Sequence, residues 1–148
     1  MPLLETVIRI NLNQPQQIID ILERNFSSLC GLRVSVLGVA FKPDTDDVRE
    51  SPALPIIHGL LARGVTVSLY DPVATESAKK VLPVDRIRFL DTLESALTDV
   101  DATVLITSWD EFPQVPELLK KAEVPPLVVD GRRILDKRQI ARYAGIGL

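Results

Sequence analysis

Short β-branched apolar runs alternate along the chain with segments whose apolar residues have helical spacing. The apolar runs are predicted to be strands, over residues 34–39, 65–70, 86–90, 102–106 and 127–129. The other segments are predicted to be helices, over residues 52–64, 75–81, 92–97, from Pro113 or Pro116 to about residue 122, and 136–144. Strands that alternate with helices form parallel βαβ units with right-handed crossovers. The pattern therefore predicts an α/β fold, a three-layer Rossmann-like domain with a mainly parallel five- or six-stranded sheet in the order 3-2-1-4-5.

Two further amphipathic segments precede the first predicted strand. Apolar residues at positions 3, 4, 7, 8 and 12 have helical spacing, and no start signal precedes them. Residues 3–12 are therefore predicted to be the tail of a longer helix. After Pro15, residues 16–26 again place apolar side chains on one helical face, and Gly31 then turns the chain into the first strand.

The composition indicates one soluble domain. The chain has 148 residues and is 46% hydrophobic, which is enough apolar material for a single core. Its net charge of −3, with both signs scattered, gives no electrostatic footprint for nucleic acid. The single cysteine excludes an internal disulfide framework and suits a reducing compartment. No apolar run is long enough to span a membrane and no signal-peptide pattern is present, so we expect a cytoplasmic location.

The loop after the first predicted strand carries the most concentrated candidate chemistry. It holds an aromatic ring, two cations and four carboxylates: Phe41, Lys42, Arg49, Asp44, Asp46, Asp47 and Glu50. Ser51-Pro52 follows, where serine can cap a helix and proline can take its first turn. A loop between a strand and a capped helix lies at the carboxyl end of a sheet, where open α/β sheets bind ligands. Two cations beside an aromatic ring suggest an anionic ligand with a flat part, such as a nucleotide.

Two other groups follow the fourth and fifth predicted strands, and the strand order brings them to the same edge. These are Thr107-Ser108-Trp109 and Asp130-Gly131-Arg132-Arg133. An arginine fork binds phosphate bidentately, whereas Lys42 offers a point charge. Phe41 or Trp109 could cover a base or a sugar face, although Trp109 is better interpreted as a packing residue at the rim of the site.

Structural interpretations of the same residues remain open. Lys42 and Arg49 could neutralise the carboxylates of their own loop, and the two adjacent arginines could be surface charges. The three aspartates of the loop lack the glycine and the distant glutamate of a calcium loop, so pairing with Arg49 is the better account. A phosphoacceptor receiver domain fits the arginine-bearing loop poorly. Cys30 and His58 are interpreted as packing or structural residues.

Residues 38–52 resemble the signature of the UDP-glucose/GDP-mannose dehydrogenase family, in its C-terminal UDP-sugar-binding domain. The segment reads Gly-Val-Ala-Phe-Lys-Pro-Asp-Thr-Asp-Asp-Val-Arg-Glu-Ser-Pro, a long and nearly gapless match. Tyr70-Asp71-Pro72 and the segments 107–112 and 130–132 resemble later landmarks of the family in the right order. The resemblance covers roughly the whole chain.

The resemblance implies a division of roles. Enzymes of this family oxidise the C6 hydroxyl of UDP-glucose to a carboxylate with two NAD per turnover. An N-terminal Rossmann domain binds NAD, a central helix dimerises, and a catalytic cysteine forms the covalent intermediates. Carried over to this sequence, Phe41, Lys42 and Arg132 would hold UDP-glucose, with Arg133 as the alternative to Arg132. Arg49 would reach across the domain interface toward NAD.

The chain also departs from the family pattern. It has no Gly-x-Gly-x-x-Gly after a strand, since Gly38 stands alone, and Cys30 does not match the catalytic cysteine. We therefore expect residues 1–29 to be the end of the central helix and a linking helix, and residues 30–148 to be the UDP-sugar-binding domain. No catalytic residue is assigned in this chain. Such a fragment is expected to be inactive without the N-terminal and central domains, which would form a homo-oligomer in the full enzyme.

Two alternatives remain. One is the same domain from an enzyme acting on GDP-mannose or UDP-N-acetylmannosamine, although the stretches 44–49 and 70–74 look closer to the UDP-glucose branch. The other is a non-catalytic nucleotide-sugar-binding module that exists alone. The interrupted helix predicted over residues 3–12 argues against this second alternative.

Overall fold

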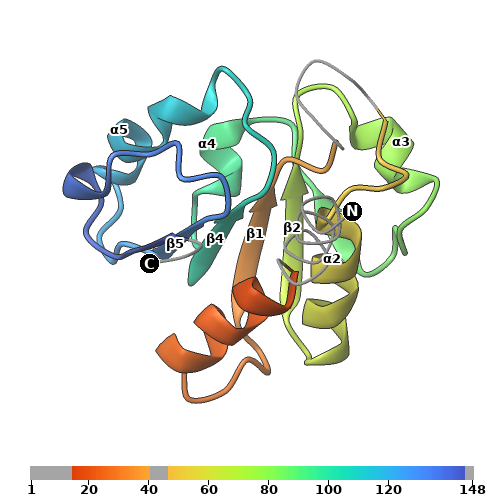
Figure 1. Ribbon diagram of the computed structural model, residues 1–148, viewed down its shortest axis with the longest axis horizontal. Helices are drawn as coiled ribbons and strands as arrows, with labels where there is room; N and C mark the ends of the chain where they lie inside the picture. The colour runs from red at the N-terminus through yellow and green to blue at the C-terminus, as the bar shows by residue number, and fades with distance from the viewer. Residues whose placement is uncertain (1–14, 41–46, 146–148) are drawn as a thin grey trace, which may run out of the picture.

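A parallel sheet of six strands, in the order β3-β2-β1-β4-β5-β6, forms the middle layer of the described structure (Figure 1). The computed structural model describes residues 15–40 and 47–145. The strands are β1 (Arg33–Leu37), β2 (Thr66–Tyr70), β3 (Ile87–Phe89), β4 (Ala102–Leu105), β5 (Leu127–Asp130) and β6 (Tyr143–Gly145). The predicted α/β class, the five predicted strands and their order are confirmed, and β6 is added beyond β5.

Helices lie on both faces of this sheet. They are α2 (Ala53–Ala62), α3 (Thr75–Lys79), α4 (Leu93–Ala96) and α5 (Val115–Leu119), together with a helix over residues 15–25. Right-handed crossovers place α2 and α3 on one face and α4 and α5 on the other. The helix over residues 15–25 lies beside α2 (Figure 1), and the carboxylate of Glu23 on the former pairs with the guanidinium of Arg63 at 3.1 Å.

The central strands are buried on both faces, as their uninterrupted apolar runs predict. In β1, the side chains of Val34, Val36 and Leu37 have no exposed surface. The polar residue between them, Ser35, is also fully buried, and its hydroxyl lies 2.8 Å from that of Thr103 on the neighbouring strand β4. This cross-strand hydrogen bond satisfies two hydroxyls that would otherwise be buried at a cost.

Helix α2 begins and ends where the sequence predicts. The hydroxyl of Ser51 accepts a hydrogen bond from the amide of Ala53 at 3.1 Å, which satisfies one of the free donors of the first turn. At the other end, Gly64 has a φ of +81° and the amide of Val65 donates to the carbonyl of Leu60 at 3.1 Å. This 6→1 bond around a left-handed glycine is a Schellman motif, so the chain is turned directly into β2.

The predicted closing helix over residues 136–144 is wrong. The chain instead makes a single 3₁₀ turn, η2 (Lys137–Gln139), and then pairs as β6 with the open edge of β5. The side chain of Asp136 accepts the amide of Arg138 at 3.0 Å, which caps that turn. Pairing with β5 satisfies backbone groups that a short surface helix would leave exposed, so the tertiary context overrides the local helical spacing.

Of two other predicted helices, one differs in the structure and one lies outside the described residues. The helix predicted from Pro113 or Pro116 to about residue 122 is a 3₁₀ turn, η1 (Phe112–Gln114), followed by α5, which ends at Leu119. The predicted helix over residues 3–12 lies outside the described residues. The predicted amphipathic helix after Pro15 is confirmed, with Ile18 and Leu22 fully buried. No described helix is both long and apolar enough to cross a membrane.

Candidate functional site

The carboxyl ends of β1, β4 and β5 lie side by side, as the predicted strand order requires. Leu37 is paired in register with Leu105, which is paired in turn with Asp130. The amide of Ile106 donates to the carbonyl of Leu37 at 2.9 Å, and the amide of Gly131 donates to that of Leu105 at 2.9 Å. The three sequence-distant loops that carry the candidate residues therefore leave the sheet at one edge.

Phe41 and Lys42 lie outside the described residues, but the backbone that leads to them is described up to Ala40. Both polar groups of Ala40 are hydrogen-bonded. Its amide donates to Oδ2 of Asp71 at 3.1 Å, and its carbonyl accepts the hydroxyl of Thr107 at 2.7 Å. The start of the candidate loop is thus fixed to the ends of both neighbouring strands, β2 and β4.

The carboxylate of Asp71 gathers five donors although only 4% of the residue is exposed. Its Oδ2 accepts the amides of Val39 and Ala40 and the indole nitrogen of Trp109, at 2.8, 3.1 and 3.1 Å. Its Oδ1 accepts the amides of Val73 and Ala74 at 2.9 and 2.7 Å. Buried carboxylates are stable when hydrogen bonds replace their lost hydration, and this one connects the loops after β1, β2 and β4.

Trp109 is a packing residue, as predicted. Its side chain is buried, with 7% of the residue exposed, and its indole nitrogen is used by Asp71. The indole therefore holds the loop after β4 against Asp71, and it offers little exposed surface for stacking on a base.

Arg132 is held in place by two hydrogen bonds at the edge between β4 and β5. Its amide donates to Oδ1 of Asp130 at 3.1 Å, and its Nε donates to the carbonyl of Ile106 at 2.7 Å. No hydrogen bond or ion pair to residues 15–40 or 47–145 occupies its two terminal nitrogens. A guanidinium that is bonded at Nε and open at the Nη atoms is oriented for an anion. Arg133, the predicted alternative, is exposed and has a left-handed backbone with a φ of 56°.

Arg49 pairs with a carboxylate of its own loop. Its Nε and Nη2 donate to Oδ1 and Oδ2 of Asp47 at 3.1 and 3.0 Å, and the side chain is 84% exposed. This hydrogen bond and the adjacent charge raise the pKa of Arg49 above its ordinary value. The prediction that the loop's acidic residues pair with Arg49 is confirmed for Asp47, whereas Asp44 and Asp46 lie outside the described residues. An exposed bidentate pair can open at low cost when an anion arrives.

The prediction that Cys30 is a packing residue is wrong, because the residue is exposed in the turn before β1. The turn is closed by the amide of Cys30, which donates to the hydroxyl of Ser28 at 3.2 Å. His58 is exposed on the outer side of α2. Cys30 lies before β1 and His58 lies within α2, so neither belongs to the loops that carry the candidate site.

Two partly buried hydrogen bonds of tyrosine hydroxyls were not predicted from the sequence. The hydroxyl of Tyr70 donates to Glu111, and the hydroxyl of Tyr143 donates to Oδ2 of Asp130 at 3.0 Å. Oδ2 of Asp130 also accepts the amide of Leu135 at 2.8 Å, so this aspartate fixes the backbone on both sides of Arg132, as Asp71 fixes Val39 and Ala40. The available signal was an aspartate at or directly after the end of an apolar strand, at 71 and at 130.

These contacts predict that the tyrosine hydroxyls titrate at an unusually high pH. The sequence contains only two tyrosines, so both contribute to the signal. Burial, followed by the charge of Asp130, raises the pKa of Tyr143 from 10.0 to about 12. Burial, followed by the hydrogen bond to Glu111, also raises the pKa of Tyr70. Since the folded state holds these protons more tightly, the stability they contribute is present below pH 10 and is lost as the pH rises toward 12.

Absorbance at 295 nm will measure this titration in the native protein and in urea. We expect the tyrosinate signal of the native protein to appear at a higher pH than that of the unfolded protein. A native midpoint at the ordinary value of 10.0 would contradict the two partly buried hydroxyl contacts.

The described start of the loop after β1 offers no free amide at Val39 or Ala40 to the pyrophosphate of a dinucleotide. In dinucleotide-binding turns the free amides after the first strand face the phosphates. Here the amides of Val39 and Ala40 already donate to the carboxylate of Asp71, so they are not available to a phosphate. The described part of this turn therefore does not form an NAD site, in agreement with the missing glycine-rich motif.

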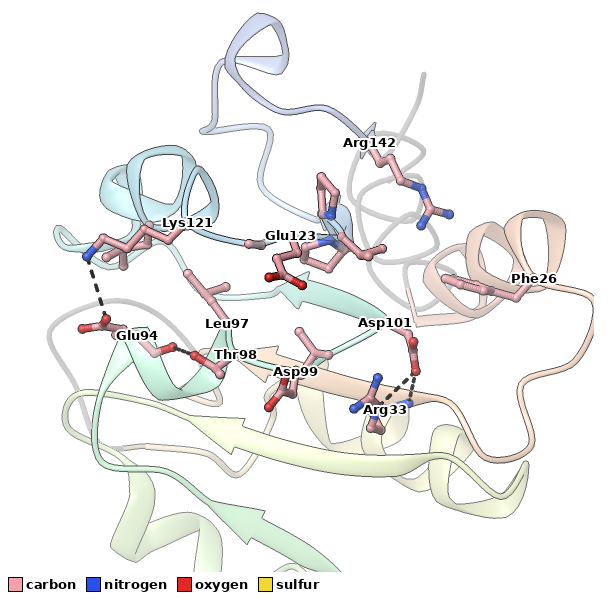
Figure 2. A pocket seen from close by; sticks show the side chains of 16 residues that line it. Phe26, Arg33, Glu94, Leu97, Thr98, Asp99, Asp101, Lys121, Glu123 and Arg142 are labelled. Carbon is pink, nitrogen blue, oxygen red and sulfur yellow. Dashed lines mark hydrogen bonds and ion pairs between the residues drawn. The ribbon is translucent and has the colours of Figure 1, made fainter.

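A cavity of about 450 Å³ lies at the opposite, amino-terminal edge of the sheet (Figure 2). It is bordered by Arg33, the first residue of β1, and by Asp101, which directly precedes β4. These two side chains pair at 3.5 Å, and Lys121 lies 3.9 Å from Glu94 across the cavity wall (Figure 2). Since cations and carboxylates are already matched there, this cavity is a poor match for a diphosphate.

Known proteins resemble this chain along most of its length. Residues 35–137 match the UDP-glucose/GDP-mannose dehydrogenase family, UDP binding domain. The chain is 40% identical to the UDP-glucose 6-dehydrogenase AglM of Haloferax volcanii, over 97% of this chain and 33% of that protein. It is 38% identical to TuaD of Bacillus subtilis, a UDP-glucose 6-dehydrogenase, over 95% of this chain and 31% of that protein.

A solved structure shows the same fold. The UDP-glucose dehydrogenase of Pyrobaculum islandicum superposes with a TM-score of 0.82 and 36% identity, over 95% of this chain and 31% of that chain. The chain spans about a third of the length of the curated relatives it matches. The chain therefore belongs to the UDP-glucose/GDP-mannose dehydrogenase family, within which it matches the UDP binding domain.

Proposed function

We propose that this chain is the C-terminal substrate-binding domain of an NAD-dependent UDP-glucose 6-dehydrogenase, which oxidises UDP-glucose to UDP-glucuronate. The observation that carries the proposal is the arrangement of the carboxyl edge of β1, β4 and β5. One end of this edge leads into the Phe41-Lys42 loop and the other presents the guanidinium of Arg132. Anionic ligands of open α/β sheets bind at this edge.

In this proposal, Phe41, Lys42 and Arg132 hold UDP-glucose. Lys42 supplies a point charge for the diphosphate, and the open Nη atoms of Arg132 supply a fork for a second anionic or hydroxyl group. Phe41 supplies an apolar ring that can lie against the sugar or the base. These contacts bind and orient the nucleotide sugar, while the catalytic cysteine would lie in another part of the enzyme.

NAD accepts hydride from the sugar C6 when it is bound, and we propose that a further domain holds it. The amides of Val39 and Ala40, which begin the first βα turn, are used by Asp71 and are not available to the pyrophosphate of NAD. The contribution proposed for this chain is the guanidinium of Arg49, which would exchange its exposed pair with Asp47 for an anionic group of the cofactor. The full enzyme would act as a cytoplasmic homo-oligomer.

UDP-glucose is favoured over the other nucleotide sugars of the family. The chain shares 28% identity with a UDP-N-acetylmannosamine dehydrogenase of Pyrococcus horikoshii, which is less than it shares with the UDP-glucose enzymes. Reduction of NAD by the full-length enzyme, measured at 340 nm with UDP-glucose, GDP-mannose and UDP-N-acetylmannosamine, tests this choice. We expect turnover with UDP-glucose, and turnover with either of the other two sugars alone would contradict it.

The division of roles predicts that two substitutions in the full-length enzyme weaken the binding of different ligands. Lys42→Ala is expected to raise the Kd of UDP-glucose by about tenfold or more and to leave the Kd of NAD unchanged, because it removes a charge-assisted phosphate contact. Arg49→Ala is expected to weaken NAD and leave UDP-glucose unchanged. Calorimetric titration with each ligand separates the two outcomes. A defect of Arg49→Ala confined to UDP-glucose would show that the assigned roles are wrong.

A further inference from the structure

We propose that Tyr143 of β6 is a positioning residue for Arg132 and acts on it through the carboxylate of Asp130. The hydroxyl of Tyr143 donates to Oδ2 of Asp130 at 3.0 Å. The other oxygen of the same carboxylate, Oδ1, accepts the backbone amide of Arg132 at 3.1 Å. One buried carboxylate therefore joins the edge strand to the backbone of the arginine. The role of Tyr143 rests on the binding role proposed above for Arg132.

Arg132 is held at two points, its backbone amide and the Nε atom of its side chain. Nε donates to the carbonyl of Ile106 at 2.7 Å. The preceding residue, Gly131, packs directly against the end of β4, because its amide donates to the carbonyl of Leu105 at 2.9 Å. A Cβ atom on Gly131 would lie 2.6 Å from that oxygen. The chain thus runs very close to β4 just before Arg132, and the backbone position of Arg132 determines whether its Nε reaches Ile106.

Asp130 depends on Tyr143 for part of its hydrogen bonding. The aspartate has no exposed surface, so protein donors must replace its lost hydration. It accepts the amides of Arg132 and Leu135, and the hydroxyl of Tyr143 is its one side-chain donor within residues 15–40 and 47–145. Without that hydroxyl, Oδ2 keeps the amide of Leu135 alone. The carboxylate is then freer to rotate, and its hydrogen bond to the amide of Arg132 is weakened.

The hydroxyl of Tyr143, and not its ring, carries this effect. The ring is partly buried and packs against the core, and phenylalanine would fill the same space. Asp71, the aspartate that follows β2, receives four backbone amides, so its position depends much less on a single side chain. At Asp130 the removal of one hydroxyl takes away one of three donors.

A guanidinium that is fixed before the ligand arrives binds an anion at a lower entropic cost. An arginine side chain that becomes ordered only on binding loses rotamer freedom at that moment, and this loss reduces the affinity. In this structure the backbone amide and Nε of Arg132 are both bonded, which leaves the terminal nitrogens pointing in one direction. Loss of the Tyr143 hydroxyl should therefore weaken the ligand that Arg132 binds.

Proton exchange at Nε of Arg132 tests the positioning in the absence of any ligand. In ¹H–¹⁵N spectra of the chain, this signal is assigned by its loss in Arg132→Lys, and its exchange rate with water is measured. We expect Tyr143→Phe to raise the rate by about threefold or more. Tyr70→Phe is the matched control, because it removes a hydroxyl that donates to Glu111, and it should change the rate by less than about twofold.

Thermal melting confirms that each variant is folded, and Asp130→Asn is the second variant. It replaces one of the two acceptor oxygens by an amide and should also raise the exchange rate by about threefold or more. If Tyr143→Phe does not fold, Asp130→Asn alone decides the result. An exchange rate that is the same in the unsubstituted chain and in the folded variants would overturn the positioning role.

Calorimetric titration of the full-length enzyme connects the position of Arg132 to affinity. We expect Tyr143→Phe to raise the Kd of UDP-glucose by about threefold to tenfold and to leave the Kd of NAD unchanged. With Arg132→Ala present, Tyr143→Phe should have an effect of less than about twofold, since the group that it positions is gone. An equal loss in both backgrounds, or no loss in either, would overturn the positioning role. If Arg132→Ala alone leaves UDP-glucose binding unchanged, the proposed binding site itself is wrong, whatever the exchange rates show.

Discussion

Asp71→Ala is expected to lower the free energy of unfolding by about 4–5 kcal/mol, the upper range for a single substitution. The change removes a buried acceptor and leaves four backbone amides and the indole nitrogen of Trp109 without their partner. Each buried donor that loses its acceptor costs about 1–3 kcal/mol, and the costs add incompletely because the donors share one carboxylate. Since the free energy of unfolding of a small domain is about 5–15 kcal/mol in total, the variant should be close to unfolding.

Urea denaturation followed by circular dichroism will measure this loss, with Asp91→Ala as the matched control. Asp91 also follows a strand, two residues after β3, but it is exposed and the described residues show no hydrogen bond to its carboxylate. The control should remain within about 0.5 kcal/mol of the unsubstituted protein. Asp71→Asn, which keeps one acceptor oxygen, should fall between the two. Equal midpoints for Asp71→Ala and Asp91→Ala would contradict the role of Asp71.

Gly38→Ala is expected to cost about 3–4 kcal/mol, for two separate reasons. Its φ of +90° disfavours any side chain, and the new Cβ would lie 2.8 Å from the backbone nitrogen of Thr107 as well as against its side chain. A backbone atom cannot move aside as the end of a flexible side chain can. The loop after β1 would have to separate from the loop after β4, which would disrupt the hydrogen bond between Thr107 and Ala40.

Gly31→Ala provides the control that separates these two causes. Gly31 has a similar φ of +83°, but a Cβ there meets nothing within 4 Å. Its substitution should therefore cost only the backbone term of about 1–2 kcal/mol. The difference between the two variants, measured by urea denaturation, reports the close packing at Gly38. A difference below about 0.5 kcal/mol would show that the loops can separate freely.

The sequence was sufficient to predict the central layer of the fold. Apolar runs predicted five strands and their order, because a strand buried on both faces needs an uninterrupted apolar run. The two ends of α2 are readable at Ser51 and Gly64, because the hydrogen bonds there join residues at most five positions apart. The last strand could not be read this way. Residues 136–144 have helical spacing, and only the open edge of β5 selects an extended chain for residues 143–145.

The candidate site was predictable in its location and much less in its internal contacts. Strand order places the loops together, but the bond between Asp71 and Val39 joins residues 32 positions apart. The bond between Thr107 and Ala40 spans 67 positions. Pairings of this kind depend on the fold as a whole, since no local pattern marks which buried aspartate receives which amide. The assignments of Phe41, Lys42, Arg49 and Arg132 to ligands remain predictions.

The exposed position of Cys30 gives this chain a single chemical handle. It is the one cysteine in the sequence, and it lies in the turn before β1, at the end of that strand away from Ala40 and Arg132. A maleimide-linked fluorophore or nitroxide should therefore attach at one defined point without touching the loops that carry the candidate site. In the isolated chain, such a probe would report the tumbling of the domain from one defined position. Cys30, which has no assigned chemical role, is thus a defined attachment point for a spectroscopic reporter.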